Sequence, residues 1–206
     1  MKIEVVPQET TPAEAFELWM TSPMPMVTLT KTFNVTKVLR ASKKRGIKFN
    51  ALLCWCIGKA ASGIKEFYIL PEKDKLFKYD SIAINVIVNN CNGGISSCDI
   101  AYTDNAEEFA KEYNLLTTQV STQCKSSFLE DSMIVGTSAM IETELDCIVN
   151  QYTDKFSNPM VMWGKYRRNW FSATLPISFQ FHHVQMDGGH GAYFLEQLQQ
   201  EINKLL

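Results

Sequence analysis

Residues 179–190 read Phe179-Gln180-Phe181-His182-His183-Val184-Gln185-Met186-Asp187-Gly188-Gly189-His190, and they hold all three histidines of the chain. An apolar run typical of a buried strand leads into a glycine turn, and apolar residues then recur with the spacing of a helix. Functional side chains often lie where a rigid strand meets a loop, and glycine lets the backbone turn there or approach a ligand. This strand–turn–helix junction is therefore the candidate functional site.

A histidine at this junction suits general-base chemistry, because its unperturbed pKa of about 6.5 lies near neutral pH. Asp187 could orient the imidazole or anchor the turn. Two other interpretations stay open on residue type alone: a hydrogen-bonded histidine pair with a structural role, and a metal site made by His183, Asp187 and His190. We expect no metal, because glycines interrupt the helical spacing and the chain offers no further histidine.

Strands and helices are expected to be interspersed along the rest of the chain. Apolar periodicity and capping residues predict helices at 36–46, 50–65, 106–123 and 189–206. Alternating or continuous apolar runs predict strands at 26–35, 75–80, 82–89, 95–102, 133–135, 140–149, 160–166 and 170–181. The turn residues of 89–94 predict a hairpin. With no repeat or linker in 206 residues, we predict one domain, 1–206, of α/β (α+β) class.

The composition indicates a folded chain, with 46% hydrophobic and 20% charged residues. A net charge of −2 without a large basic cluster gives no reason to expect nucleic acid as a partner. No apolar run approaches the roughly 20 residues that cross a bilayer, so we expect no membrane association and a cytoplasmic protein. The six cysteines form no CxxC pair and are expected to be reduced and mainly structural.

The order His182-His183-Val184-Gln185-Met186-Asp187-Gly188 resembles the HHxxxDG signature of the chloramphenicol acetyltransferase family. Looser versions of that signature occur in dihydrolipoamide acyltransferase cores and in the condensation domains of peptide synthetases. Other segments resemble the same family in the same order, so that the resemblance spans nearly the whole chain. They are Lys48-Phe49, Lys65-Glu66-Phe67, Gly164-Lys165-Tyr166, 175–181 and 195–199.

The resemblance implies a two-layer α/β sandwich with a mixed sheet and helices packed on one face. It also implies a homotrimer with active sites at the subunit interfaces. The implied function is an acetyl-CoA-dependent O-acetyltransferase acting on a small hydroxyl acceptor, chloramphenicol or a related molecule, and hence a role in antibiotic resistance. His183 would be the general base of a direct transfer without an acyl-enzyme, and Asp187 would support the site geometry.

Coenzyme A carries phosphates, for which lysines are ordinary partners. Lys48 and Lys165 lie in segments that resemble the family, and they are the expected cofactor-binding residues. An acceptor pocket is expected to draw on apolar side chains, with Met24, Met26, Trp163 and Phe171 as candidates.

The chain departs from the family pattern at two helper positions. The family carries a serine in a Trp-x-Ser-Phe-Thr segment that stabilises the oxyanion, whereas Ile141 stands there in this chain. Thr143 is kept, and Thr143, Ser138 or a backbone N–H is expected to replace the serine. Pro12 stands where the family has the arginine that pairs with the motif aspartate. Asp187 is therefore expected to find a backbone N–H, Arg167 or Arg168 instead.

Two alternatives to the acetyltransferase are considered. A catalytically silent, trimeric binding module would keep the fold and lack the transition-state donors, as the departures at Pro12 and Ile141 allow. A dihydrolipoamide acyltransferase would use a thiol acceptor through similar chemistry. The second is less favoured, because the chain shows neither a lipoyl domain nor a flexible Ala/Pro linker.

Overall fold

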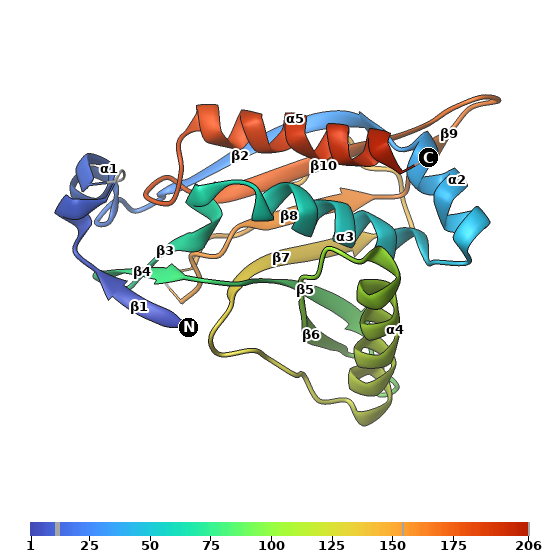
Figure 1. Cartoon of the computed structure of the whole chain (residues 1–206), viewed down its shortest axis with the longest axis horizontal. Helices are drawn as coiled ribbons and strands as arrows, with labels where there is room; N and C mark the ends of the chain where they lie inside the picture. The colour runs from blue at the N-terminus through green and yellow to red at the C-terminus, as the bar shows by residue number, and fades with distance from the viewer. Residues whose placement is uncertain (11–12, 154, 206) are drawn as a thin grey trace.

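A mixed sheet carries the candidate site at one end of its strand β10 (Figure 1). The computed structural model describes residues 1–10, 13–153 and 155–205. The helices are η1 (Pro7–Glu9), α1 (Ala13–Trp19), α2 (Thr36–Arg45), α3 (Phe49–Ser62), η2 (Lys65–Tyr68), α4 (Ala106–Gln123) and α5 (Gly188–Lys204). The strands are β1 (Lys2–Val5), β2 (Met26–Asn34), β3 (Ile69–Glu72), β4 (Lys75–Tyr79), β5 (Ile82–Asn89), β6 (Ile95–Ala101), β7 (Met133–Met140), β8 (Met160–Gly164), β9 (Arg167–Arg168) and β10 (Ala173–His182).

The seven-stranded sheet has the order β2-β10-β8-β7-β5-β6, with β9 paired to β10 as a short hairpin. β7 runs parallel to both β5 and β8, and the remaining pairs are antiparallel. A separate three-stranded sheet has the order β1-β4-β3. The predicted α/β (α+β) class with a mixed sheet is therefore confirmed.

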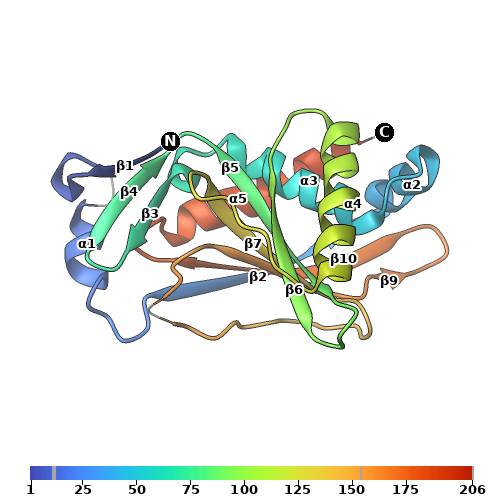
Figure 2. The same ribbon diagram turned by 90° about the horizontal axis from the view of Figure 1, so that it is seen from below.

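Helices α3, α4 and α5 form a layer on one face of the large sheet, while α1 lies beside the small sheet, as Figures 1 and 2 show together. α3 lies between α4 and α5 and contacts both. Its apolar residues are buried nearly all round, which is expected of a helix enclosed by neighbours on several sides. This arrangement confirms the predicted layering of helices on the sheet.

The side chains of β10 alternate between two environments. Leu175, Ile177, Phe179 and Phe181 point into the core beneath the helices, while Ser178, Gln180 and His182 are buried on the other face. Phe179 packs against Phe67 and against Phe194 of α5, with ring centroids 5.8 and 4.5 Å away. Aromatic packing therefore holds α5 against the strand that precedes it.

Gly191 lets α5 approach β10 closely, and its replacement by alanine is expected to destabilise the fold by about 1–3 kcal/mol. A Cβ atom there would lie 2.5 Å from the Phe181 ring and 3.0 Å from Leu29. Gly188→Ala is the matched control, because a Cβ at Gly188 meets nothing within 4 Å. Urea unfolding of both variants measures the difference. Equal stability of the two would contradict the packing argument.

Most predicted elements are found within a few residues of their expected bounds. The helix expected at 36–46 ends at Gly46, whose φ of +67° is the left-handed conformation that favours glycine. Asn105 caps α4 by accepting hydrogen bonds from the backbone N–H groups of Glu107 and Glu108. The hairpin expected at 89–94 joins β5 to β6.

Two expectations about strands are wrong, and some short elements were not expected. Residues 141–149 are not a strand: this segment lies on the polar face of β10, where Ser178 Oγ accepts from the N–H of Ile148 and thus replaces a strand partner. Residues 170–172 precede β10, and Trp170 and Phe171 are 97% and 87% exposed. β1, α1 and β3 were not expected, because each is too short to show a clear period.

Candidate active site

His182 ends β10 and holds the turn that follows it. Its Nδ1 accepts a hydrogen bond from the backbone N–H of Val184 at 3.1 Å, so the ring proton of the neutral imidazole lies on Nε2. Burial, and secondarily the nearby His183, lowers the pKa of His182 to about 4. His182 is thus a neutral structural residue at physiological pH.

The buried His182 makes the fold sensitive to mild acid. The unfolded chain binds a proton at His182 near pH 6.5 and the folded chain only near 4, so stability is lost as the pH falls through this interval. The difference corresponds to about 3 kcal/mol. Urea unfolding at pH 7 and pH 4.5 should show this loss, and His182→Asn, whose side chain can still accept from Val184, should show less of it. An equal loss in both proteins would contradict the assignment.

His183 follows as the first residue of the turn and is held differently. Its ring stacks on Trp19 of α1, with centroids 4.8 Å apart and an interplanar angle of 5°. Its backbone N–H donates to the carbonyl oxygen of Pro25 at 2.8 Å. Its Nδ1 is buried and makes no hydrogen bond with the described residues. The imidazole is thus fixed by stacking, half-buried, and not committed to a structural hydrogen bond.

Asp187 caps the helix α5. Its Oδ1 accepts from the backbone N–H of His190 at 2.9 Å, and this hydrogen bond is the main cause that lowers the pKa of the carboxyl group. The same oxygen lies 2.9 Å from Nδ1 of His190, without hydrogen-bond geometry. Nε2 of His190 lies 3.4 Å from the buried carboxylate of Glu66. Of the partners expected for Asp187, a backbone N–H is therefore the one found.

The arginines expected as alternatives lie elsewhere. Arg167 pairs with Asp146 and Glu144, and Arg168 lines a groove described below. Pro12, where the family arginine was expected, lies outside the described residues.

Replacing Asp187 by alanine is expected to cost about 1 kcal/mol, because the cap of α5 is lost. Asp187→Asn keeps an oxygen that can accept from His190 and should cost much less. The negative charge of Asp187 adds to the stability of the folded chain, because its pKa is lowered on folding. This stability is fully present above the ordinary carboxyl pKa of about 3.9, and it is lost as the pH falls through the lower pKa of the folded state. Urea unfolding of both variants at pH 7 and pH 3 tests this, and equal costs of the two substitutions at pH 7 would exclude the capping role.

The predicted cofactor-binding residues lie together at the other end of the sheet. Two adjoining cavities of about 540 and 710 Å³ share several lining residues and form one groove, which we call the lysine groove. Lys48 and Lys165 line its larger part, and Thr143 lines the smaller part. The residues common to both cavities are Asn50, Val88, Tyr113, Ile141 and Trp163.

Hydrogen bonds place Thr143 in this groove beside Lys165. The carbonyl oxygen of Thr143 accepts from the backbone N–H of Lys165 at 2.7 Å. Its hydroxyl makes a long hydrogen bond, 3.4 Å, to the carbonyl of Glu144. Nε1 of the buried Trp163 has no hydrogen-bond partner among the described residues. The hydroxyl of Thr143 is thus a weakly engaged donor along the groove, whereas the indole N–H of Trp163 is buried beneath it.

The lysine groove and His183 are far apart within one chain. Ile177 of β10 pairs with Trp163 of β8, and His183 lies six residues beyond Ile177. At about 3.4 Å per residue, His183 is roughly 20 Å from the level of Trp163, and Lys165 extends in the opposite direction. The structure thus brings Lys48, Lys165 and Thr143 together and keeps His183 and Asp187 apart from them.

The comparison with known families shows which family the chain belongs to. A model of the family described as chloramphenicol acetyltransferase matches residues 8–199. This chain belongs to the chloramphenicol acetyltransferase family. The resemblance found in the sequence is confirmed, and the protein is an acyltransferase of this type.

Alignments with known relatives span most of this chain. Chloramphenicol acetyltransferase 2 of Escherichia coli is 22% identical over 183 residues, which are 86% of each chain. The chloramphenicol acetyltransferase of Clostridium perfringens is 26% identical over 193 residues, 90% of this chain and 87% of the relative. These identities are low enough that the substrate of the relatives does not follow from them alone.

Solved structures agree on the fold. A chloramphenicol acetyltransferase superposes with a TM-score of 0.83 at 18% identity, covering 98% of this chain and 100% of that chain. A probable dihydrolipoamide acetyltransferase from Listeria monocytogenes gives a TM-score of 0.67 at 12% identity, covering 95% and 93%. The predicted chloramphenicol acetyltransferase-like sandwich is confirmed.

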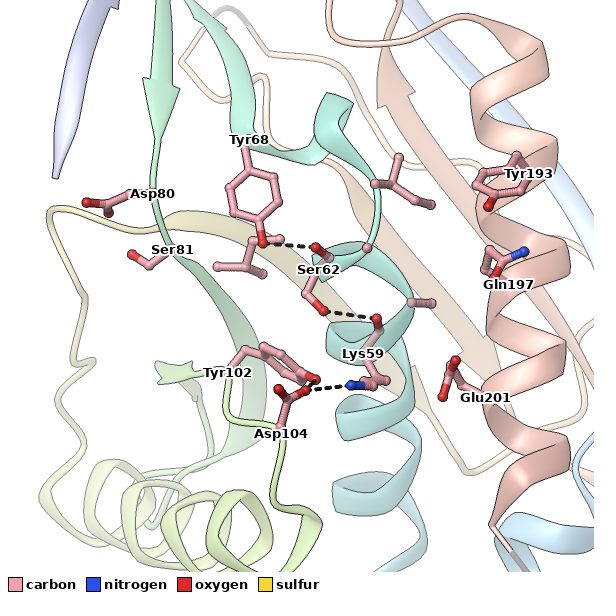
Figure 3. Close-up of a pocket in the computed structure, with 14 residues that line it drawn as sticks. Lys59, Ser62, Tyr68, Asp80, Ser81, Tyr102, Asp104, Tyr193, Gln197 and Glu201 are labelled. Atoms are coloured by element: carbon pink, nitrogen blue, oxygen red, sulfur yellow. Dashed lines mark hydrogen bonds and ion pairs between the residues drawn. The ribbon is translucent and has the colours of Figure 1, made fainter.

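Two further cavities of this family member differ in character. A cavity of about 510 Å³ on the polar face of the sheet is lined by Met26, Gln180, Asn85 and Phe156, among others. Figure 3 shows a hollow of about 540 Å³ between α3, α5 and the start of β5. Three of its polar residues are paired with one another, since Lys59 and Tyr102 both contact Asp104. None of the predicted site residues lines this second hollow.

The expected acceptor residues are divided among different places. Met26 lines the polar-face cavity and Trp163 lines the lysine groove. Met24 and Phe171 are exposed and line none of the cavities described above, so the structure does not bring the four together.

Metal and membrane sites were also sought. Within residues 1–10, 13–153 and 155–205, no three or more His, Cys, Asp or Glu side chains are grouped as metal ligands would be. In the same part of the chain, no helix is long and apolar enough to span a bilayer.

Sequence reasoning missed Trp19 and Gln180. Trp19 lies on the unexpected helix α1, and its stacking on His183 joins residues far apart in sequence. Gln180 was treated as part of a strand, although a fully buried amide within an apolar run is itself a signal of a polar contact.

Proposed function

We propose that this protein is an acetyl-CoA-dependent O-acetyltransferase acting on a small hydroxyl acceptor, chloramphenicol or a related molecule. The observation that carries the proposal is the state of His183: its ring is fixed by Trp19 while its partner His182 takes the structural hydrogen bond. Because Nδ1 of His183 is buried, Nε2 is the nitrogen left to meet a substrate. In this role His183 is the general base, and Asp187 supports the geometry by capping α5.

The proposed reaction is a direct transfer. Nε2 of His183 takes the proton of the acceptor hydroxyl while the oxygen attacks the thioester carbonyl of acetyl-CoA. The tetrahedral intermediate collapses, the carbon–sulfur bond breaks, and the imidazolium returns the proton to the departing sulfur. The products are the O-acetyl ester and free coenzyme A, with no acyl-enzyme and no metal.

The lysine groove is the proposed site for acetyl-CoA. Lys48, Lys165 and Arg168 line its larger part and offer three positive charges for phosphate groups. Thr143 is the proposed oxyanion donor, since its hydroxyl is only weakly engaged.

We propose further that a homotrimer completes the site at its subunit interfaces. The proposed oxyanion donor Thr143 and the base His183 must meet at one thioester carbonyl. Within one chain His183 lies roughly 20 Å from the level of Trp163, so a second copy is proposed to supply one of the two. The polar-face cavity, at the same end of β10 as His183, is the proposed acceptor pocket. Residues 1–206 would act as one domain, in the cytoplasm, without nucleic acid or membrane as partners.

Incubation with acetyl-CoA and a panel of hydroxyl acceptors, starting with chloramphenicol, tests this function. Release of free thiol should depend on the acceptor, and mass spectrometry should find the acetylated product. No acceptor-dependent release across the panel, or release unchanged in His183→Ala, would overturn the proposal.

Two observations favour other functions, which the same experiments can test. Ile141 in place of the family serine, and Pro12 in place of the arginine, favour a silent binding module. Calorimetry would then show coenzyme A binding without turnover. The structural likeness to dihydrolipoamide acetyltransferases makes dihydrolipoamide a useful thiol acceptor for the panel, followed through its acetylated product.

A further inference from the structure

Two cysteines outside the proposed active site lie against each other at the surface. Cys91 lies in the turn after β5, and Cys124 follows the last residue of α4. Their Sγ atoms are 2.7 Å apart, and both thiols are free. This separation is shorter than the contact distance of two unbonded sulfur atoms and within an ångström of the bond length in a disulfide.

The backbone on both sides keeps the pair in place. The N–H of Cys91 donates to the carbonyl oxygen of Ser121 at 3.0 Å, and Ser121 Oγ donates to the carbonyl of Asn89 at 2.8 Å. Cys124 ends α4 in the left-handed conformation, with φ of +53°. The end of α4 and the turn after β5 are therefore joined before any covalent bond forms, and bringing the sulfurs together requires little movement.

The other four cysteines differ from this pair. Cys54, Cys56 and Cys98 are buried, and burial raises the pKa of each thiol. Cys147 is exposed but contacts only the hydroxyls of Thr30 and Ser178. Cys91 is exposed and Cys124 partly exposed, so this is the pair of adjacent thiols that an oxidant in solution can reach.

We propose that Cys91 and Cys124 form a dithiol–disulfide modification site, whose oxidant is a low-molecular-weight disulfide such as glutathione disulfide. Either thiol can donate in their hydrogen bond, so either can react first, and both routes give the same disulfide. In one route Cys124 begins. Its thiolate attacks one sulfur of the oxidant, the sulfur–sulfur bond breaks, and one glutathione leaves. Cys91 then attacks the Cys124 sulfur and releases the second glutathione. The two protein thiol protons go to the two departing glutathiones.

The cross-link would act on the lysine groove without entering it. Asn89 and Val88, just before Cys91, line the groove from β5, and Tyr113 lines it from α4. A covalent tie between the ends of these two elements restrains their relative motion. The site itself rests on the thiol geometry and does not depend on the proposed acetyl transfer.

The reduced full chain, treated with glutathione disulfide, tests the proposal by intact mass and peptide mapping. The concentration of glutathione disulfide is raised until half of the Cys147 thiols carry glutathione. This shows, in the same sample, that the reagent reaches exposed thiols. Peptide mapping should then find Cys91 and Cys124 in one cross-linked pair of peptides that has lost two hydrogens. Neither residue should retain glutathione. Stable glutathione adducts on either, or two unmodified thiols, would overturn the proposal.

Two variants distinguish cross-linking of this cysteine pair from non-specific oxidation of exposed thiols. Cys124→Ser should stop the reaction, leaving Cys91 with a mixed disulfide at most. Cys147→Ser is the matched exposed control and should leave the cross-link unchanged. If the cross-link forms while acetyl transfer proves absent, the modification site stands and only the proposed function fails.

Discussion

Replacing His183 by alanine is expected to lower kcat for acetyl transfer by about 10²- to 10⁴-fold, the range that a positioned general base contributes. The loss should fall on kcat because His183 acts on the acceptor hydroxyl in the transition state. KM for acetyl-CoA should stay nearly constant, since the residues proposed to hold acetyl-CoA are those of the lysine groove, and His183 is not among them. Initial rates of thiol release over a range of acetyl-CoA concentrations measure both constants.

The matched control is His190→Ala, which removes the other half-buried histidine of the same segment. His190 contacts Asp187 and Glu66 through its ring, so its loss is expected to affect the start of α5 much more than proton transfer. Thermal unfolding should show that His183→Ala remains folded. A decrease in kcat as large in His190→Ala as in His183→Ala would contradict the assignment of the base, as would a His183→Ala enzyme with normal kcat.

The fold could be predicted from local pattern because its main elements are long and strongly periodic. Helix α4 shows both a cap at Asn105 and an apolar stripe, and β10 has large apolar residues at every second position from Leu175 to Phe181. The segment 141–149 could not be predicted, because its backbone N–H at Ile148 is satisfied by a side chain, Ser178, rather than by a neighbouring strand. Short elements such as α1 are fixed by what they pack against, and sequence shows little of that.

For the candidate site, too, some features could be predicted from the sequence and others could not. The residues of the motif could be named from the sequence, and so could the lysines, because residue type and spacing limit the chemistry. What sequence could not show is which of two adjacent histidines is engaged: His182 accepts from Val184, whereas His183 stacks on Trp19. Nor could it show that Thr143 lies with Lys165 and far from His183, because that depends on the pairing of β10 with β8.

Two inactive variants are expected to restore activity when they share one oligomer. His183→Ala removes the base, and the double variant Lys48→Glu/Lys165→Glu reverses two charges of the lysine groove. If each site takes His183 from one copy and the groove from the next, every trimer that holds both variants has both parts intact in one of its three sites. Co-expressed with different affinity tags and purified through both, the mixed oligomers are assayed beside each variant alone.

Activity from one site of three distinguishes an interfacial site from one built within a single chain. In the single-chain case every site carries one defect, so the mixture would be no more active than the variants separately. The sheet register favours the interfacial case, because Ile177 opposite Trp163 fixes His183 and the groove at opposite ends of one rigid sheet. No loop movement can close roughly 20 Å along paired strands without breaking the pairing of β10 with β8. Mixed oligomers without activity, formed by chains that are active when wild type, would therefore exclude the shared site.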